Sequence, residues 1–466
     1  MELFGIIKFD ALGWLFNSFV LMFVAVFTGM LFGKIKFGKF NFGVSGTLFT
    51  GLIMGWWVYG KGQAIIENQD AASSAAKAAS KMIKAQVVSK DFFILFLVIF
   101  VAAVGLLAAK DMGAVLKKYG LKFVIMGFLI TLMGAAATYG MTKFSPGANP
   151  YEVSGVYTGA LTSSPGLAAA IETAKGHATH KVEEFDTMTD KEKDKFFHIL
   201  GNKKLNKENT KKLTPEIKDA FIKKAEAGIG VGHAIGYPFG VLIVIIVVNF
   251  FPKIFGMNVD EEYKRFQAEM NEARGMSGGK EIEEVNFDLT AFAVACFMGY
   301  TIGKIKIYLG PVLGDFSLGS TGGVLIGSLI LGYIGKIGIL NFRMNNKILG
   351  VIRQLALAFF LAIVGLRYGF SVFDSLFGSG AYLALVSLVV GVVAMSIGFA
   401  IGRYVFNINW IMLSGAICGG MTSTPGLGAA IEAVGNDDPA AGYGATYPFA
   451  LLGMVIFTIV LHNLPM

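Results

Sequence analysis

The chain has 466 residues, of which 54% are hydrophobic and 15% charged, whereas soluble domains carry about 25% charged residues. This composition excludes an ordinary soluble enzyme. The net charge of +8, in so apolar a chain, favours a role in membrane topology and contact with anionic lipid over nucleic-acid binding.

Apolar runs near the length of a bilayer-spanning helix recur along the chain. None shows the alternating pattern of a barrel strand, so we predict an all-α polytopic membrane protein. The runs of the first half are 14–33, 40–59, 91–109, 121–141, 152–174 and 229–251. The runs of the second half are 287–303, 316–334, 348–366, 379–402, 408–432 and 441–463.

Three polar stretches separate these runs. Residues 60–90 are Ala-rich with lysines at helical spacing, which predicts a surface helix at the membrane boundary. Residues 175–228 are dense in Lys, Asp and Glu, and capping signals at Thr189 and Thr214 predict two short helices there. Residues 256–286 predict a further, amphipathic helix.

The chain contains an internal repeat. Residues 154–172 match residues 414–432 with 12 identities in 19 positions, at an offset of 260. The segment Tyr-Pro-Phe at Tyr237 recurs at Tyr447, at an offset of 210. The first half therefore holds about 50 extra residues between these motifs, and the charged segment 175–228 accounts for them.

The repeat predicts the organisation of the chain as two homologous halves, each with about five spans and one interrupted segment. The expected units are the main part of the first membrane repeat (1–174), a charged helical insertion (175–228), the last span of the first repeat (229–252), a short polar linker helix (253–286) and the second membrane repeat (287–466).

Each half carries a Thr-Ser-Ser/Thr-Pro-Gly segment inside an apolar run. Proline and glycine interrupt a helix, and the backbone groups freed by the break must line a cavity or lie buried in protein. The half-helix after the break points its positive dipole end at that cavity, where a carboxylate can bind. Two matched breaks predict a transporter binding site near the bilayer midplane. The candidate substrate-binding residues are Thr162, Ser163, Ser164, Pro165, Gly166, Thr422, Ser423, Thr424, Pro425 and Gly426.

Ionisable residues inside spans are further candidates, because they are costly in lipid unless paired or solvated. Glu172 and Glu432 match across the repeat, and either carry coupling protons or cations or end half-helices at the water boundary. Arg353 and Arg367 either select an anionic substrate or anchor a helix at the interface. His233 is a candidate proton carrier, although a packed, hydrogen-bonded histidine is the commoner case. We expect no metal site and no cofactor.

With these motifs the sequence resembles the aspartate:alanine exchanger family of bacterial secondary transporters, whose halves each carry a Gly-x-x-Thr-x-Thr-Pro-Gly-Leu-like segment and a Tyr-Pro-Phe segment. Thr162, Ser164, Thr422 and Thr424 occupy the hydroxyl positions of that motif, and Ser164 is a conservative departure. The resemblance implies exchange of small carboxylates, typically aspartate for alanine or a dicarboxylate such as succinate.

The resemblance also implies halves of opposite orientation, an elevator-like core and scaffold, a homodimer and a place in the cell (inner) membrane. Typical members carry a large soluble domain between the halves, and here the linker 253–286 is too short for one.

The orientation of the halves depends on the interrupted segments. If these cross the membrane, the repeats are parallel; if they are re-entrant, each half has five crossings, the repeats are inverted and the linker is cytoplasmic. We favour the inverted arrangement, although Lys304 and Lys306 then break the positive-inside rule.

The sequence thus predicts a secondary transporter, an antiporter of small carboxylates or amino acids working by alternating access. The alternative is a sodium- or proton-coupled organic-anion symporter. A channel suits two discontinuous helices less well, and the sequence lacks the metalloprotease and nucleotide-binding motifs that would favour an intramembrane enzyme.

Overall fold

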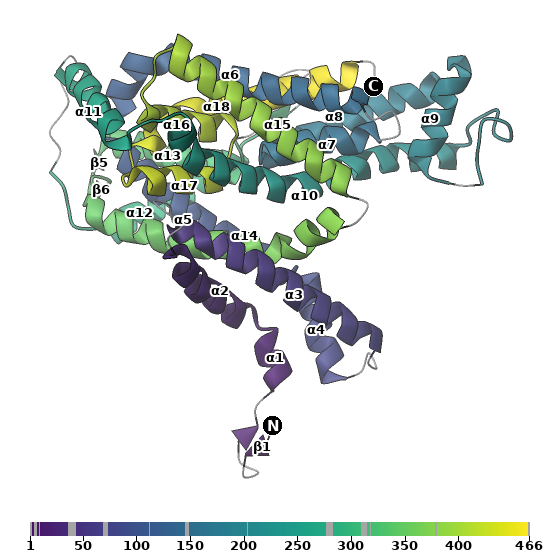
Figure 1. The fold of residues 1–466 in the computed structure, drawn as a ribbon, viewed down its shortest axis with the longest axis horizontal. Helices are drawn as coiled ribbons and strands as arrows, with labels where there is room; N and C mark the ends of the chain where they lie inside the picture. The colour runs from purple at the N-terminus through teal and green to yellow at the C-terminus, as the bar shows by residue number, and fades with distance from the viewer. Residues whose placement is uncertain are drawn as a thin grey trace.

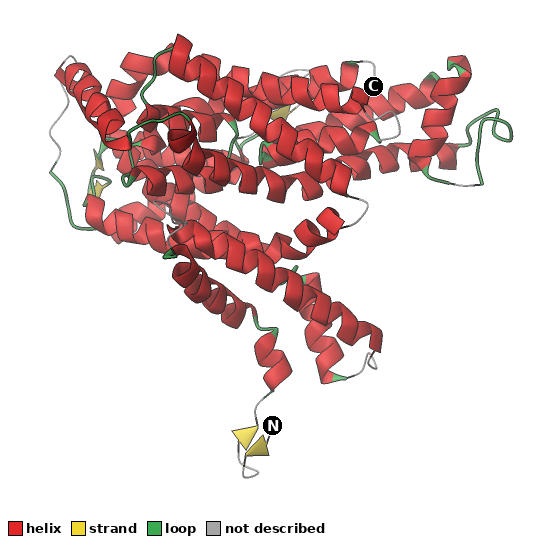
Figure 2. Ribbon diagram, in the orientation of Figure 1, coloured by secondary structure: helices red, strands yellow, loops and turns green. Residues whose placement is uncertain are grey.

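The computed structural model is almost entirely helical in the residues that it describes (Figure 2). These are residues 2–3, 7–8, 10–35, 43–68, 73–110, 112–144, 149–202, 204–275, 283–308, 315–316, 318–377 and 380–464. Strands occur in this part only as short antiparallel pairs. The pairs join β1 (Glu2–Leu3) to β2 (Ile7–Lys8), β3 (Ile307–Tyr308) to β4 (Asp315–Phe316) and β5 (Lys336–Ile337) to β6 (Leu340–Asn341).

The helices of the first half follow the predicted runs, with the charged insertion among them. They are α1 (Ala11–Leu15), α2 (Ser18–Gly33), η1 (Gly43–Ser45), α3 (Gly46–Asn68), α4 (Ser74–Lys84), α5 (Lys90–Ala108), α6 (Met112–Phe144), α7 (Pro150–Ala160), α8 (Ser164–Glu183), η2 (Phe185–Thr187), α9 (Asp190–Leu200) and α10 (Pro215–Ile254).

The second half repeats the order of the main membrane helices after a linker helix. Its helices are α11 (Val259–Gly275), α12 (Leu289–Lys304), α13 (Gly319–Ile334), α14 (Asn346–Phe377), α15 (Ala381–Ala400), the π-turn η3 (Ile401–Val405), α16 (Trp410–Gly420), α17 (Thr424–Val434) and α18 (Pro439–Asn463).

Six of the described helices are long and apolar enough to cross a membrane, so the chain is a multi-pass membrane protein. They are α5, α6, α10, α14, α15 with η3, and α18. The shorter apolar helices include α2, α12, α13 and α16.

The membrane helices pack in two groups. One group contains α2, α3, α5, α12, α13 and α14, and α2, α3, α12 and α14 lie in the lower part of Figure 1. The other contains the broken helices with α6, α10, α15 and α18. Equivalent helices make equivalent contacts across the two halves. Helix α3 packs on α14 and its equivalent α13 packs on α5, while α6 packs on α18 and its equivalent α15 packs on α10. This pattern is that of a pseudo-twofold assembly of two repeats.

Glycines at equivalent positions allow the same close helix contacts in both halves. A Cβ atom at Gly155 on α7 would overlap the carbonyl oxygen of Ile229 on α10. A Cβ atom at Gly415 on α16 would likewise overlap the carbonyl oxygen of Pro439 on α18. The two pairs are related by the offsets of the sequence repeat, so the duplication extends to backbone packing.

The first interrupted segment is a helical hairpin, which we call hairpin 1 (α7 and α8). Its tip is the turn at residues 161–163. The hydroxyl of Tyr151, at the start of α7, lies 3.0 Å from Nδ1 of His177, far along α8. The second helix therefore returns to the level at which the first began, so the segment is re-entrant. We call this open end the root of the hairpin.

The second interrupted segment, hairpin 2 (α16 and α17), returns in the same way, because Pro439 after α17 packs on Gly415 near the start of α16. Helix α18 starts at this root and ends at the root of hairpin 1, where His462 lies 3.3 Å from the Ser154 hydroxyl. The two roots thus lie at opposite ends of a spanning helix, which agrees with the predicted inverted repeats.

The polar segments match their predicted caps but not all of their predicted lengths. The capping box between Thr189 and Glu192 is present at the start of α9, and Thr214 caps α10 with Pro215 in the first turn. The prediction of two separate short helices in 175–228 is wrong. Helix α8 runs on to Glu183, and α10 continues without interruption from the insertion to Ile254. Buried apolar residues recur every four positions through the start of α10, at Phe221, Ala225 and Ile229, so the helix continues on one packed face between the insertion and the membrane run.

Candidate functional site

The tips of the two hairpins meet inside the protein and bond reciprocally. The Thr162 hydroxyl donates to the carbonyl oxygen of Met421 at 3.3 Å. The Thr422 hydroxyl donates to the carbonyl oxygen of Leu161 at 2.6 Å. All four residues are buried, so each hydroxyl satisfies a main-chain group that the helix break leaves open.

Both tip threonines adopt the left-handed backbone conformation, with φ of 52° at Thr162 and 49° at Thr422. A β-branched residue takes up this conformation at a cost of about 1–3 kcal/mol, and such strain concentrates at ligand sites. The same strained geometry therefore occurs at the same motif position in both halves.

The serine after each tip threonine is a helix cap. The Ser163 hydroxyl accepts the Gly166 amide at 3.1 Å, and the Ser423 hydroxyl accepts the Gly426 amide at 3.2 Å. Helices α8 and α17 therefore both begin at the meeting point of the tips. Their dipoles place two partial positive charges there, about half a charge each.

A small cavity of about 50 Å³ lies beside the tips. Hydroxyl-bearing side chains line it from both halves, together with apolar groups of α5 and α14. Its lining consists of Phe93, Leu97, Thr162, Tyr237, Thr321, Phe360, Thr422, Thr424, Pro425 and Tyr447. The volume suits one or two water molecules, so the tips are in a closed arrangement.

The remaining motif residues lie around this cavity or at its edge. Thr424 shares a hydrogen bond of 3.3 Å with the Tyr443 hydroxyl. Gly426 packs on Val244 of α10. Ser164 and Pro165 form the first turn of α8, and their side chains lie outside the described part of the structure.

Glu432 and Arg353 lie at the root of hairpin 2, away from the tip cavity. Oε1 of Glu432 accepts the Val44 amide at 2.6 Å, at the start of η1. Arg353 on α14 pairs with Asp437, in the turn between α17 and α18. Both contacts join hairpin 2 to the other packing group. The side chain of Glu172, the counterpart of Glu432, lies outside the described residues.

Arg367 and His233 are engaged elsewhere. The Arg367 guanidinium donates to the carbonyl oxygens of Ala85 and Val88 in the turn between α4 and α5. It therefore fixes a turn and does not line the tip cavity. His233 accepts or donates a hydrogen bond of 2.9 Å with the Thr158 hydroxyl within the contact between α7 and α10.

Sequence reasoning missed the tyrosines of the cavity. Tyr237 and Tyr447 both line it, one from each half. The Tyr-Pro-Phe segments indicate the repeat and support the family resemblance, but by themselves they do not mark these tyrosines as lining residues. The signal available was their duplication, since a hydroxyl-bearing aromatic repeated beside a helix break is a candidate lining residue.

These features define a class of protein. A multi-pass membrane protein with discontinuous helices whose half-helix starts meet inside the bundle has the architecture of a secondary transporter. The chain belongs to the aspartate:alanine exchanger type of permease, because the family model described as Predicted Permease Membrane Region matches residues 21–253 and 291–463. The protein is therefore a membrane transporter.

Curated relatives carry the same general description. An uncharacterized transporter of Desulfotalea psychrophila is 26% identical, and the alignment covers 96% of each chain. An uncharacterized transporter of Bacteroides thetaiotaomicron is 37% identical over 38% of this chain and 33% of its own length. One of Bacteroides fragilis is 38% identical over 37% of this chain and 32% of its own length. These names describe transport without a substrate.

Proposed function

We propose that the protein is an antiporter that exchanges small carboxylates or amino acids, aspartate for alanine or a dicarboxylate such as succinate. The observation that carries the proposal is the meeting of two helix starts and two strained threonines at one cavity. A carboxylate is the ligand that paired helix N-termini and hydroxyl donors favour.

In this proposal the substrate carboxylate replaces the reciprocal tip contacts. Thr162 and Thr422 release the opposite carbonyl groups and donate to the substrate, while Tyr237 and Tyr447 contribute hydroxyls from the sides. A cavity of about 50 Å³ is smaller than an amino acid, so binding requires the tips to separate from the apolar side chains of α5 and α14.

The two packing groups give this movement a physical basis. The hairpins with α6, α10, α15 and α18 form a core, and α2, α3, α5, α12, α13 and α14 form a scaffold. We propose alternating access by an elevator-like displacement of the core, in a homodimer located in the inner membrane. The units 1–174 with 229–252 and 287–466 are then the two repeats, joined by the linker 253–286.

Exchange in proteoliposomes tests this function. Vesicles loaded with alanine are given labelled aspartate or succinate outside, and exchange is compared for the unmodified protein and for T162A/T422A. Loss of two hydrogen bonds to a charged substrate is expected to reduce exchange at least about tenfold. Thr301→Ala is the control, because the exposed Thr301 hydroxyl bonds only within its own helix. Unchanged exchange of all three substrates in the double variant would show that the tip cavity is not the substrate-binding site.

A cation-coupled symporter is the second candidate, and Glu432 favours it. Its Oε2 atom is buried without a hydrogen-bond partner among the described residues, as a proton- or cation-binding carboxylate would be. Uptake into vesicles that contain no counter-substrate, driven by a sodium or proton gradient and abolished by Glu432→Gln, would select the symporter. The antiporter gives no such uptake.

A further inference from the structure

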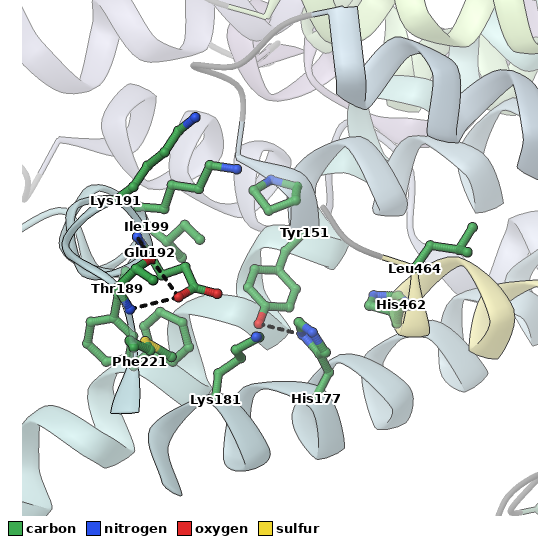
Figure 3. A pocket seen from close by; sticks show the side chains of 14 residues that line it. Tyr151, His177, Lys181, Thr189, Lys191, Glu192, Ile199, Phe221, His462 and Leu464 are labelled. Carbon is green, nitrogen blue, oxygen red and sulfur yellow. Dashed lines mark hydrogen bonds between the residues drawn. The ribbon is translucent and has the colours of Figure 1, made fainter. Parts of the chain in front are cut away.

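A second and larger cavity lies at the root of hairpin 1. It has a volume of about 620 Å³, within the range of about 300–1,000 Å³ that small-molecule sites occupy. Hairpin 1, α9 of the charged insertion and the end of α18 line it, and it is partly open to solvent (Figure 3). The insertion has no counterpart in the second half, so this cavity is not duplicated by the repeat.

One wall of this root cavity is aromatic. Phe196 of α9 stacks on Phe221 of α10, with ring centroids 3.9 Å apart and an interplanar angle of 11°. Tyr151 of α7 meets Phe221 edge-on at 6.3 Å. All three side chains are nearly fully buried in their own cluster, so they form a rigid apolar base, and the partly exposed Met188 and Ile199 supply accessible apolar surface beside it.

The polar part of the cavity lining is positively charged. Among the described residues that line the cavity, Lys181, Lys191 and Lys195 are positively charged and Glu192 supplies the one carboxylate. The Glu192 carboxylate accepts the Thr189 amide at 2.8 Å and the Thr189 hydroxyl at 2.7 Å. These bonds hold the pKa of Glu192 below its usual range, so this group is ionised and already engaged in the helix cap. Lys181 also lies 3.8 Å from the Glu184 carboxylate, which is outside the described lining. The described lining itself therefore carries a net positive charge, which favours an anion.

The two histidines of the cavity have different roles. In His462, Nδ1 donates to the Thr458 carbonyl oxygen at 2.9 Å and Nε2 accepts from the Ser154 hydroxyl, so both ring nitrogens are used. Burial lowers the pKa of His177 to about 4, so His177 is neutral at pH 7. When the Tyr151 hydroxyl donates to Nδ1 of His177, Nε2 carries the proton and is a donor for an anion.

We propose that this root cavity binds a small organic anion in which an aromatic ring carries a phosphate or carboxylate group. The ring lies against Met188 and Ile199, beside the aromatic cluster, and the anionic group faces the three lysines, which act as point charges for it. The site is separate from the tip cavity, since the two share no lining residue. It does not depend on which substrate is transported.

Calorimetric titration of the full-length protein with phenyl phosphate, in phosphatidylcholine nanodiscs, tests the site. We expect saturable binding at least tenfold tighter than that of inorganic phosphate, which lacks the ring, and weaker binding as salt is raised. Benzyl alcohol, which lacks the charge, is expected not to bind. T162A/T422A is expected to bind phenyl phosphate normally, because neither residue lines the root cavity, so failure of the exchange proposal leaves this measurement unaffected.

Charge reversal provides the matched comparison. K191E/K195E changes two exposed lysines of the cavity and is expected to weaken binding at least tenfold. K211E/K212E makes the same change in charge at two exposed lysines of the same insertion outside the cavity, and is expected to have no effect. Lys181→Met, which keeps the apolar stem, is expected to weaken binding if the first variant fails to fold.

Three results would overturn the proposal. These are equal binding of phenyl phosphate and inorganic phosphate, equal losses in the cavity and control variants, and loss of phenyl phosphate binding when the nanodiscs contain phosphatidylglycerol. The last result would assign the cavity to the headgroup of an anionic lipid. Equal affinity in the two kinds of nanodisc supports a soluble ligand.

Discussion

The two hairpins agree at their tips and differ at their roots. At the tips the two threonines share a left-handed backbone and reciprocal hydrogen bonds. At the root of hairpin 2, Arg353 with Asp437 and Glu432 with Val44 attach the hairpin to α14 and η1. At the root of hairpin 1, the hydrogen bond between Ser154 and His462 attaches it to α18 instead.

This difference indicates that the tips of the two repeats must stay alike, whereas the roots can differ. The tips form one joint site and constrain each other, so a change in one alters the partner's bonds. The roots lie at opposite ends of α18, so a change at one root does not alter the contacts of the other. One root therefore has the insertion next to it, and the other has the ion pair between Arg353 and Asp437.

The largest expected effect tests the packing that the halves share. Gly232→Ala and Gly442→Ala should each destabilise the protein by about 1–3 kcal/mol or more, because the new methyl group overlaps the carbonyl oxygen of Glu152 in one half and of Met412 in the other. Thermal unfolding in detergent measures both. Gly230→Ala, on the same helix with open space around it, is the control. Tolerance of alanine at only one of the two sites would break the equivalence of the halves.

A smaller effect is expected at the root of hairpin 2. Asp437→Asn leaves the partly buried Arg353 without its carboxylate and should cost about 1–3 kcal/mol of stability. The exposed pair of Lys223 and Asp219 is the comparison, and Asp219→Asn should cost less than about 0.5 kcal/mol. If thermal unfolding shows the same loss of stability for Asp437→Asn and Asp219→Asn, the ion pair at the root of hairpin 2 contributes no more than an ordinary surface pair.

The smallest effect separates equivalent serines of the two hairpins. Ser154 reaches across to His462, whereas its counterpart Ser414 bonds to the Ile411 carbonyl oxygen of its own helix. Ser154→Ala should cost about 1 kcal/mol, because it leaves a buried imidazole nitrogen without its donor. Ser414→Ala should cost less than about 0.5 kcal/mol, and a cost equal to that of Ser154→Ala would contradict the assignment of the Ser154 contact.

Much of this architecture was accessible from the sequence because it follows from local rules. The helix starts after Thr162 and Thr422 follow from a serine N-cap with proline in the first turn, which is a local signal in each half. The capping box at Thr189 likewise depends only on residues three positions apart.

What lay beyond the sequence depends on how distant segments approach. The Arg367 guanidinium binds carbonyl groups around Val88, and nothing local in either segment indicates that pairing. The reciprocal tip bonds require the mutual register of two hairpins that are 260 residues apart. The root cavity exists only where α9 and the end of α18 meet.

The reciprocal bonding of the tips has a consequence for cooperativity. Thr162 donates to the carbonyl group next to Thr422, and Thr422 donates to the carbonyl group next to Thr162. Separation of the hairpin tips thus breaks both hydrogen bonds together. The tips therefore have a single free energy of separation and not two independent ones. A ligand that displaces one of the two tip hydrogen bonds also weakens the other, because both depend on the same register of the hairpins. This favours an all-or-none opening of the tips over a series of partly open states.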